Sequence, residues 1–387
     1  MSYKLNKKIL EAISSQHEEL VDLIKTLCKI PAPLNGEKQR AEFCKQWLEK
    51  CGAKGVYIDA VYNVIYQLNC DDNNDVSVFM AHTDTVFPAT TQLLLKEADG
   101  KLYCPGVGDD TSNLALLMMS IKYIIKNNLQ PDRGCVFVCD SGEEGLGNLK
   151  GVRAIMDAFG KRVKALYSFD GTSEKLVNCA VGSVRYKVEI KTEGGHSFSK
   201  FGNKNAIAYL AALITDLYKV KVPEQGRTTY NVGTIAGGTS INSIAQQAEM
   251  LFEYRSNVRE HLEEMMVNFD KIIDSYRAKG VEINMKIIGK RACMGNVDKV
   301  AMQEISTKVA DIFETYTSHR LSGSSSSRDS NIPLSMGIPA VSFGGYKGHG
   351  NHTKEEWIEL ASLKTGFPLI LTTILDEFRA NNADLFE

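Results

Sequence analysis

Acidic and histidine side chains follow four apolar segments of this chain, at the point where each segment ends. The apolar segments are VFMA, GCVFVC, ALYSF and AVSFGG, and the residues that follow them are His82 with Asp84, Asp140 with Glu143 and Glu144, Asp170, and His349 with His352. A fifth acidic segment, residues 106–110 (GVGDD), precedes a predicted helix. Ligand sites of open α/β sheets lie beyond the carboxyl ends of the strands, so these segments are expected to meet at one edge of a sheet.

Histidine and carboxylate side chains collected in this way indicate a metal site. Imidazole and carboxylate ligands suit zinc, manganese and cobalt where no thiolate is offered. A catalytic zinc uses three protein ligands and a water, and two histidines with three carboxylates exceed that number. One bridging carboxylate with two further ligands for each ion would hold two metals about 3.5–4 Å apart. The number of ligands therefore predicts a dinuclear site.

Each motif taken alone has a simpler explanation. A His-x-Asp triplet is more often a pair of surface residues than a pair of ligands, and a Glu-Glu pair is usually solvated or begins a helix. Residues 106–111 (GVGDDT) resemble a nucleotide-binding loop, but two adjacent aspartates would repel a phosphate, so an acidic turn is the better alternative. The joint placement of four clusters where buried strands end favours the metal site over these explanations.

The segments that position these residues indicate an α/β sheet. Segments 76–81, 134–139, 165–169 and 339–343 are apolar throughout, which is typical of strands covered by helices on both faces. Helices are predicted at 9–28, about 112–126 and about 360–379. Between 183 and 288 the pattern becomes strand–helix–strand–strand–helix–strand, the ferredoxin-like order. We therefore predict an α/β domain of residues 1–181 and 293–387, interrupted by an α+β domain of residues 182–292.

Composition excludes several classes of protein. Of 387 residues, 43% are apolar and 24% are charged, as in a globular chain. The formal net charge is −2, so neither a nucleic-acid partner nor a polybasic membrane-surface role is expected. The longest apolar run, 114–119, is too short to span a membrane, and the first residues lack the apolar stretch of a signal peptide. Nine cysteines without a CxxC pair predict reduced thiols and a cytoplasmic location.

Five motifs, in their order and spacing, resemble those of the M20 zinc-dependent metallopeptidases. They are HTDTVFP at 82–88, PGVGDD at 105–110, the Glu-Glu pair at 143–144, GGHS followed by GNKNAI at 194–207, and HTKEE at 352–356. The family includes peptidase T, glutamate-releasing carboxypeptidases, carnosine dipeptidases and aminoacylases. The resemblance covers nearly the whole chain. It implies a zinc-peptidase-like α/β catalytic domain with an inserted ferredoxin-like α+β domain that serves as a lid and in dimerisation.

The resemblance implies a role for each residue of the site. The implied ligands are His82 and Asp170 for one ion, Glu144 and His352 for the other, and Asp109 as the bridge between them. Glu143 matches the general base that takes a proton from the bridging water and later passes it to the leaving amine. Asp84 matches the carboxylate behind His82, which would fix the tautomer of that histidine. Two divalent ions per chain are expected, with Zn²⁺ favoured and Co²⁺ or Mn²⁺ as alternatives.

Further substrate contacts are implied in and beside the inserted domain. His196 matches a histidine that helps hold the scissile carbonyl oxygen and, in dimeric members, reaches the partner subunit's site, so a homodimer is expected. Asn242 and Arg255 resemble lid residues that bind polar groups or the carboxylate of the substrate. Asp329 lies in a stretch that resembles the substrate end of the cleft, next to a serine-rich loop predicted at 322–327.

The chain departs from the family after the bridging aspartate. The common form has Asp-Lys-Gly or Asp-Met-Lys-Gly there, whereas Asp109 is followed by Asp110, Thr111, Ser112 and Asn113. The bridging role needs only the carboxylate, and Ser112 is expected to cap the following helix. In the family the peptide bond after this aspartate is often cis.

Several functions are open at this point. The first is hydrolysis of short peptides by an exopeptidase of the tripeptidase or carboxypeptidase kind, and the second is removal of an acyl group from an N-acyl amino acid. Asp at position 170 is closer to the peptidase branch, since the deacylase branch commonly has Glu there. A third possibility, a metal-free binding or scaffold homologue, would predict a missing ligand, and none is missing. A serine hydrolase would need a GxSxG elbow, which the chain lacks.

Overall fold

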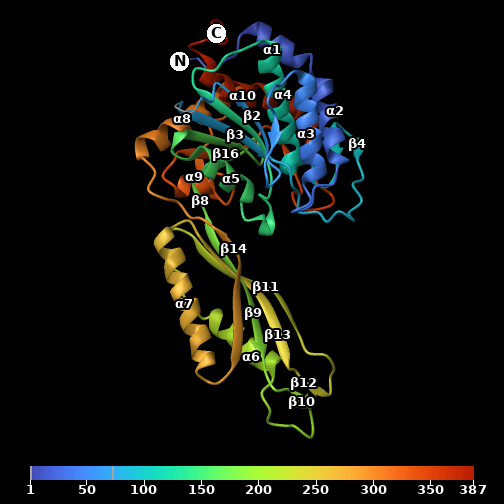
Figure 1. The fold of residues 1–387 in the computed structure, drawn as a ribbon, viewed down its shortest axis with the longest axis vertical. Coiled ribbons are helices and arrows are strands. Elements are labelled where there is room, and N and C mark those ends of the chain that lie inside the picture. Colours follow the sequence, from blue (N-terminus) through green and yellow to red (C-terminus); the bar gives the residue numbers. More distant parts are fainter. Residues whose placement is uncertain (1, 72–73) are drawn as a thin grey trace. The chain divides into compact units, whose positions relative to one another are not determined.

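The computed structural model describes residues 2–71 and 74–387, and the chain divides into two compact units (Figure 1). The first unit comprises residues 1–180 and 296–387, and the second comprises residues 181–295. All five implied metal ligands belong to the first unit. His196, Asn242 and Arg255 belong to the second.

Eight strands form the main sheet of the first unit, in the order β1-β2-β6-β3-β7-β16-β8-β15. Their bounds are β1 Tyr57–Ile58, β2 Val64–Leu68, β3 Val76–His82, β6 Gly134–Asp140, β7 Val163–Phe169, β8 Leu176–Ala180, β15 Gly323–Ser326 and β16 Ala340–Phe343. Neighbouring strands among β6, β3, β7 and β16 are parallel. Their carboxyl ends therefore lie at one edge of the sheet, as the α/β prediction required.

Helices cover this sheet. The helices of the first unit are α1 Lys7–Ser14, α2 His17–Cys28, α3 Lys38–Cys51, α4 Asn113–Lys126, α5 Lys150–Phe159, α8 Lys299–Thr317, α9 Asn331–Ser335 and α10 Leu363–Leu375. Helix α4 packs on β3 and is itself covered by α2, α3 and α10. Burial on all sides explains why its residues 114–119 are apolar without interruption.

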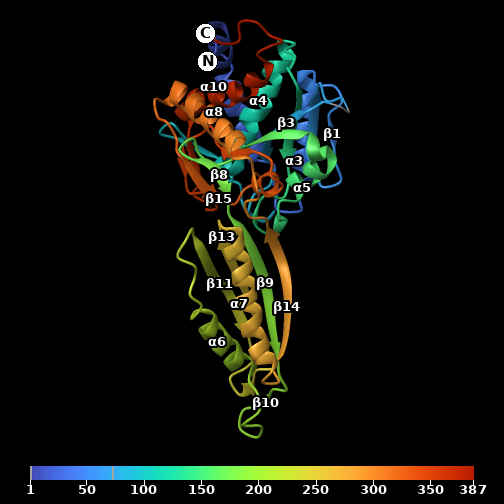
Figure 2. The same cartoon turned by 90° about the vertical axis from the view of Figure 1, so that its left-hand side faces the viewer.

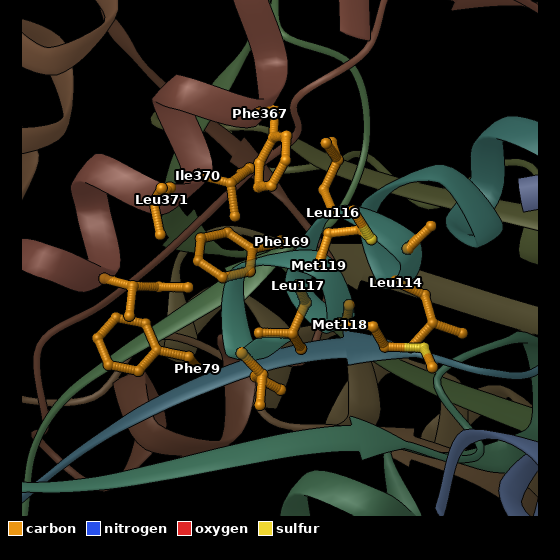
Figure 3. Packing of buried hydrophobic residues seen from close by; sticks show 14 of the residues in the cluster. Phe79, Leu114, Leu116, Leu117, Met118, Met119, Phe169, Phe367, Ile370 and Leu371 are labelled. Atoms are coloured by element: carbon orange, nitrogen blue, oxygen red, sulfur yellow. The ribbon is translucent and has the colours of Figure 1, made fainter. Parts of the chain in front are cut away.

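Aromatic side chains of adjacent strands pack together in the hydrophobic core between the sheet and helix α4. Phe79 of β3 stacks on Phe137 of β6 and on Tyr167 of β7, with ring centroids 5.6 and 5.1 Å apart. Figure 3 shows Phe367 and Ile370 of α10 beside residues of α4 and above Phe169 of β7. Burying one such side chain stabilises the fold by roughly 1.5–3 kcal/mol. This core fixes the strand ends that carry the candidate ligands.

A second, four-stranded sheet of the first unit joins two loops of the site. Its order is β17-β18-β5-β4, with β17 Gly348–His349, β18 Trp357–Glu359, β5 Lys101–Tyr103 and β4 Lys96–Ala98. The pairing of β18 with β5 holds residues 349–357 beside the loop that begins at Cys104, because the Cys104 N–H donates to the Glu356 carbonyl at 3.1 Å.

The second unit is a four-stranded antiparallel sheet with two helices, and this confirms the ferredoxin-like prediction. The sheet order is β11-β13-β9-β14, with β9 Gly182–Lys191, β11 Thr228–Gly237, β13 Gln247–Ser256 and β14 Glu282–Arg291. Helices α6 (Ala206–Leu217) and α7 (Arg259–Arg277) pack on the sheet face that carries Tyr186 and Phe252 (Figure 2). A short β10–β12 pair, Gly195–His196 with Ser243–Ile244, lies outside this sheet.

Two local predictions were wrong. The helix predicted at 9–28 is broken between α1 and α2, where the Ser15 hydroxyl and the Gln16 amide both donate to the Ala12 carbonyl and compete with the helical backbone pattern. The loop predicted at 322–327 contains the strand β15, which pairs with β8 in parallel. A polar strand is tolerated there because β15 lies at the sheet edge, where one side is not paired.

All nine cysteines are free thiols. Within residues 2–71 and 74–387, no helix is both long enough and apolar enough to cross a bilayer.

Candidate metal centre

The candidate site lies at the carboxyl edge of the parallel strands. His82 is the last residue of β3, Asp170 follows β7, and the Glu143–Glu144 pair follows β6 by three residues. Asp109 lies in the turn Val107–Ser112 just before α4, and its backbone angles and those of Asp110 are not helical. The sheet therefore brings together residues that are up to 88 positions apart in the first half of the chain, because parallel strands end at the same edge.

His82 is the centre of a first donor group. Its Nε2 lies 3.1 Å from Oδ1 of Asp109, and its Nδ1 lies 3.0 Å from the backbone carbonyl of Asp84. His82, Asp109, Asp110 and Asp170 each place one ligand atom within 4.8 Å of the others, and they are largely shielded from solvent. Three carboxylates and one imidazole form the donor set that zinc, manganese or cobalt accept.

His352 is the centre of a second donor group. Its Nε2 lies 2.9 Å from Oε1 of Glu144 and 3.5 Å from Oδ2 of Asp109. Asp109, Glu144 and His352 again have ligand atoms within 4.8 Å of one another. The Asn351 amide donates to Oδ2 of Asp109 at 3.1 Å and so fixes that carboxylate. The two oxygens of Asp109 thus face different histidines, and Asp109 belongs to both donor groups.

Asp84 connects His82 to the glutamate pair. Its carboxylate accepts hydrogen bonds from the backbone N–H groups of Glu143 at 3.2 Å and Glu144 at 2.9 Å. The sequence placed this carboxylate behind His82, but the nearer group to Nδ1 is the Asp84 carbonyl, because the carboxylate oxygen is 3.6 Å away. The carbonyl accepts the Nδ1 proton, which orients the ring so that Nε2 faces Asp109.

Electrostatics of the site depend on burial and on these contacts. Burial alone would lower the pKa of His82, but Asp110, Asp109 and Asp84 raise it well above its usual value. Hydrogen bonds that the protonated ring donates to Asp109 and Glu144 raise the pKa of His352 to about 10. Burial would raise the pKa of Asp109, but the two histidines hold it well below its usual value. The carboxylates therefore attract positive charge to both halves of the site.

Sequence reasoning missed Glu356, which positions Asp109. The buried Glu356 carboxylate accepts the N–H groups of Gly106 at 2.7 Å, Gly108 at 3.0 Å and Asp109 at 2.8 Å. The motif HTKEE contained the signal, since Glu356 lies four residues after the candidate ligand His352. The contact of Glu356 with this loop was not predictable, because the two are separated by about 250 residues in the sequence.

The turn after Asp109 is also held by side chains. Asp110 accepts hydrogen bonds from the His82 N–H at 3.1 Å and from the Asn113 amide at 2.7 Å. The Asp109–Asp110 peptide bond is cis, which confirms the expectation from the family. The prediction that Ser112 caps α4 was wrong, because its hydroxyl donates to the Val107 carbonyl at 2.7 Å.

The predicted substrate residues lie in different surroundings. His196 and Asn242 are exposed in the second unit, and the Arg255 guanidinium forms hydrogen bonds to both carboxylate oxygens of Glu253 at 2.9 and 3.1 Å. Asp329 differs from its prediction. It is buried in the first unit, both of its carboxylate oxygens are shielded from solvent, and Asp140 lies beside it, so its carboxylate offers no surface to a substrate.

The chain is similar in sequence to known proteins. Residues 78–376 match the profile of peptidase family M20/M25/M40. An uncharacterized protein of Bacillus subtilis is 25% identical over 363 residues, which cover 87% of this chain and 93% of that protein. An acetylornithine deacetylase of Buchnera aphidicola is 25% identical over 193 residues, which cover 46% of this chain and half of that enzyme.

Solved structures share the fold over nearly the whole chain. A tripeptidase of Staphylococcus aureus has a TM-score of 0.75 at 20% identity, with 94% of this chain and 99% of that chain covered. A Bacillus subtilis protein described as a dinuclear metal-binding peptidase of the M20 family has a TM-score of 0.65 at 16% identity, with 95% and 100% covered. The chain thus belongs to peptidase family M20/M25/M40 and is a hydrolase that acts on peptide or amide bonds.

Proposed function

We propose that this protein is a dinuclear metal-dependent exopeptidase that cleaves short peptides. The observation that carries the proposal is the shared position of Asp109, whose two carboxylate oxygens face His82 in one donor group and His352 in the other. The oxygen Oδ2 of Asp170, shielded from solvent and without a hydrogen-bond partner among the described residues, supplies a further vacant ligand atom. The donor set fits Zn²⁺, with Co²⁺ and Mn²⁺ as alternatives.

In this proposal His82, Asp109 and Asp170 hold one ion, and Asp109, Glu144 and His352 hold the other. Two divalent ions held there supply the positive charge that polarises the scissile carbonyl and lowers the pKa of water. Glu143 accepts the proton of the attacking water and donates it to the leaving amine. Asp84 holds the backbone of both glutamates through their N–H groups, and one carboxylate oxygen of each lies within 4.8 Å of a ring nitrogen of His82, so both side chains reach the site.

We further propose that the second unit is a lid that forms a homodimer. Strand β11 lies at the edge of its sheet, where its outer side has no partner strand among the described residues, and the apolar Ile235 is 57% exposed on it. An unpaired edge of this kind suits a second copy of the same strand. His196 would then donate a hydrogen bond to the developing oxyanion of the partner subunit's site, a contribution of about 10²–10³ in turnover. Asn242 and Arg255 are proposed to bind polar groups and the carboxylate of the substrate.

Two kinds of substrate suit this site. Short peptides are favoured because Asp170 occupies the position typical of the peptidase branch, and the structural neighbours include a tripeptidase and a dipeptidase. N-acyl amino acids are the alternative, because a deacetylase is among the curated relatives. Free thiols at all nine cysteines agree with the proposed cytoplasmic location.

A substrate panel tests the proposal. Metal-reconstituted protein is assayed against di- and tripeptides, C-terminally blocked peptides and N-acyl amino acids, each before and after chelation. We expect hydrolysis of unblocked di- or tripeptides that chelation abolishes and divalent metal restores. Cleavage confined to N-acyl amino acids would identify a deacylase instead. No metal-dependent hydrolysis of any class would contradict the proposal and favour a scaffold role.

A further inference from the structure

A guanidinium group borders the first donor group. Arg328 forms an ion pair through Nη1 with Oδ1 of Asp170, a proposed ligand of the first ion. The other carboxylate oxygen, Oδ2, is shielded from solvent and has no hydrogen-bond partner in the described part of the chain. Asp170 thus gives one oxygen to arginine and keeps the other for a metal.

The surrounding backbone holds Arg328 in this place. Its N–H donates to Oδ1 of Asn331 at 3.0 Å, and the Asn331 N–H donates to the Arg328 carbonyl at 2.9 Å. The guanidinium also lies against Gly171, where an added Cβ would come within 3.0 Å of Nη2. That contact would be tight, and the backbone of Gly171, with φ +89°, favours glycine as well. The positive charge is therefore a fixed feature of this half of the site.

The two donor groups differ in their direct contact with arginine, because Arg328 pairs with Asp170 of the first group, although its charge also acts at longer range on Asp109, which both groups share. The Asp109–Glu144–His352 group has no comparable contact, since within the described residues no lysine or arginine forms an ion pair with Asp109 or Glu144. The repulsion energy between a fixed guanidinium and a divalent ion rises as the distance between them falls, and it is larger where water is excluded. The Asp170 side of the site carries that repulsion directly.

We propose that Arg328 makes the two halves of the site unequal, so that the Glu144–His352 half binds its ion tightly and the His82–Asp170 half binds its ion weakly and exchangeably. The proposal rests on the dinuclear site of the proposed function. A partner that merely orients a ligand has the opposite effect, since its loss typically lowers metal affinity about 10- to 100-fold. The sign of the change therefore separates the two roles of Arg328.

Metal titration of the whole chain tests the proposal. Metal-free wild type, Arg328→Gln, Arg328→Met and Arg328→Lys are dialysed against graded Co²⁺, and bound metal is counted by mass spectrometry. Glutamine keeps a donor for Asp170 but loses the charge, so the weaker dissociation constant should fall at least about tenfold. Methionine has a similar volume and no charge, so Arg328→Met should lower the weaker dissociation constant as well. Lysine keeps the charge and should stay close to wild type.

The control is Arg162→Gln, because the Arg162 guanidinium donates to the backbone carbonyl of Asn74 at 2.9 Å and contacts no proposed ligand. It should leave both constants unchanged. If the uncharged variants at Arg328 leave the weaker constant unchanged or raise it, the inference is wrong while the dinuclear site stands. If wild type and the uncharged variants all bind one ion or none, the proposed function itself is contradicted.

Discussion

Metal binding to this protein should release protons, and the geometry sets the number. Nε2 of His352 lies 3.5 Å from Asp109 and 2.9 Å from Glu144, and these carboxylates raise its pKa to about 10. His82 also has a raised pKa, owing to the aspartates around it. A metal binds only the neutral imidazole, so each proton on Nε2 must leave before the ion enters.

The magnitude follows from these pKa values. At pH 7.5 a histidine with the usual pKa of about 6.5 would release about 0.1 proton on metal binding, whereas His352 should release about one. Removing that proton at pH 7.5 costs roughly 3 kcal/mol, which lowers the apparent affinity about 300-fold. Because the protonated form competes with the metal, affinity should rise about tenfold per pH unit for each proton and level off near pH 10.

Calorimetric titration in buffers of different ionisation enthalpy counts these protons. Wild type should release one to two protons for two ions at pH 7.5, and His352→Gln should release about one fewer. His319→Gln, at an exposed position outside both donor groups, is the control and should match wild type. Release of less than about 0.2 proton, or an affinity that does not change between pH 6 and 9, would refute the reasoning.

Three further predictions concern single glutamates and the lid. Glu143→Ala should lower turnover about 10²–10⁴-fold and still bind both ions, whereas Glu144→Ala should bind metal more weakly. Metal analysis and kinetics of both variants check this, and the reverse pattern would mean that the two glutamates have exchanged roles. Glu356→Gln should weaken metal affinity about 10- to 100-fold, whereas Glu355→Gln, at the exposed neighbouring position, should leave it unchanged. Equal effects of the two variants would show that Glu356 does not support metal binding. Mixing His196→Ala with Glu143→Ala chains should restore part of the activity if His196 acts across a dimer interface, and no recovery despite proven subunit exchange would place it elsewhere.

The parts of the fold that sequence predicted well are those set by local pattern. The four apolar segments became β3, β6, β7 and β16, because a strand buried on both faces needs an uninterrupted apolar run. The alternation over 183–192 likewise became β9, with one face packed on helices. Local competition was harder to foresee. The first helix is broken where Ser15 and Gln16 both donate side-chain hydrogen bonds to the Ala12 carbonyl, and β15 is a strand without an apolar pattern.

The residues of the candidate site also differ in how far local sequence predicts them. The proximity of His82, Asp109 and the Glu143–Glu144 pair was predictable, because each lies just after a strand or just before a helix, where the fold dictates the direction of the chain. Glu356 and Arg328 were not, because each acts on a residue far away in the chain, Glu356 on Asp109 and Arg328 on Asp170. Such contacts depend on tertiary packing, and no spacing within a motif reports them.

The central claim is that two ions share the carboxylate of Asp109. Anomalous X-ray scattering from crystals of zinc-reconstituted protein, recorded above and below the zinc absorption edge, tests it most directly. We predict two anomalous peaks about 3.5–4 Å apart, one beside His82 and Asp170 and the other beside Glu144 and His352. A single peak at full zinc loading, or peaks away from Asp109, would contradict the account.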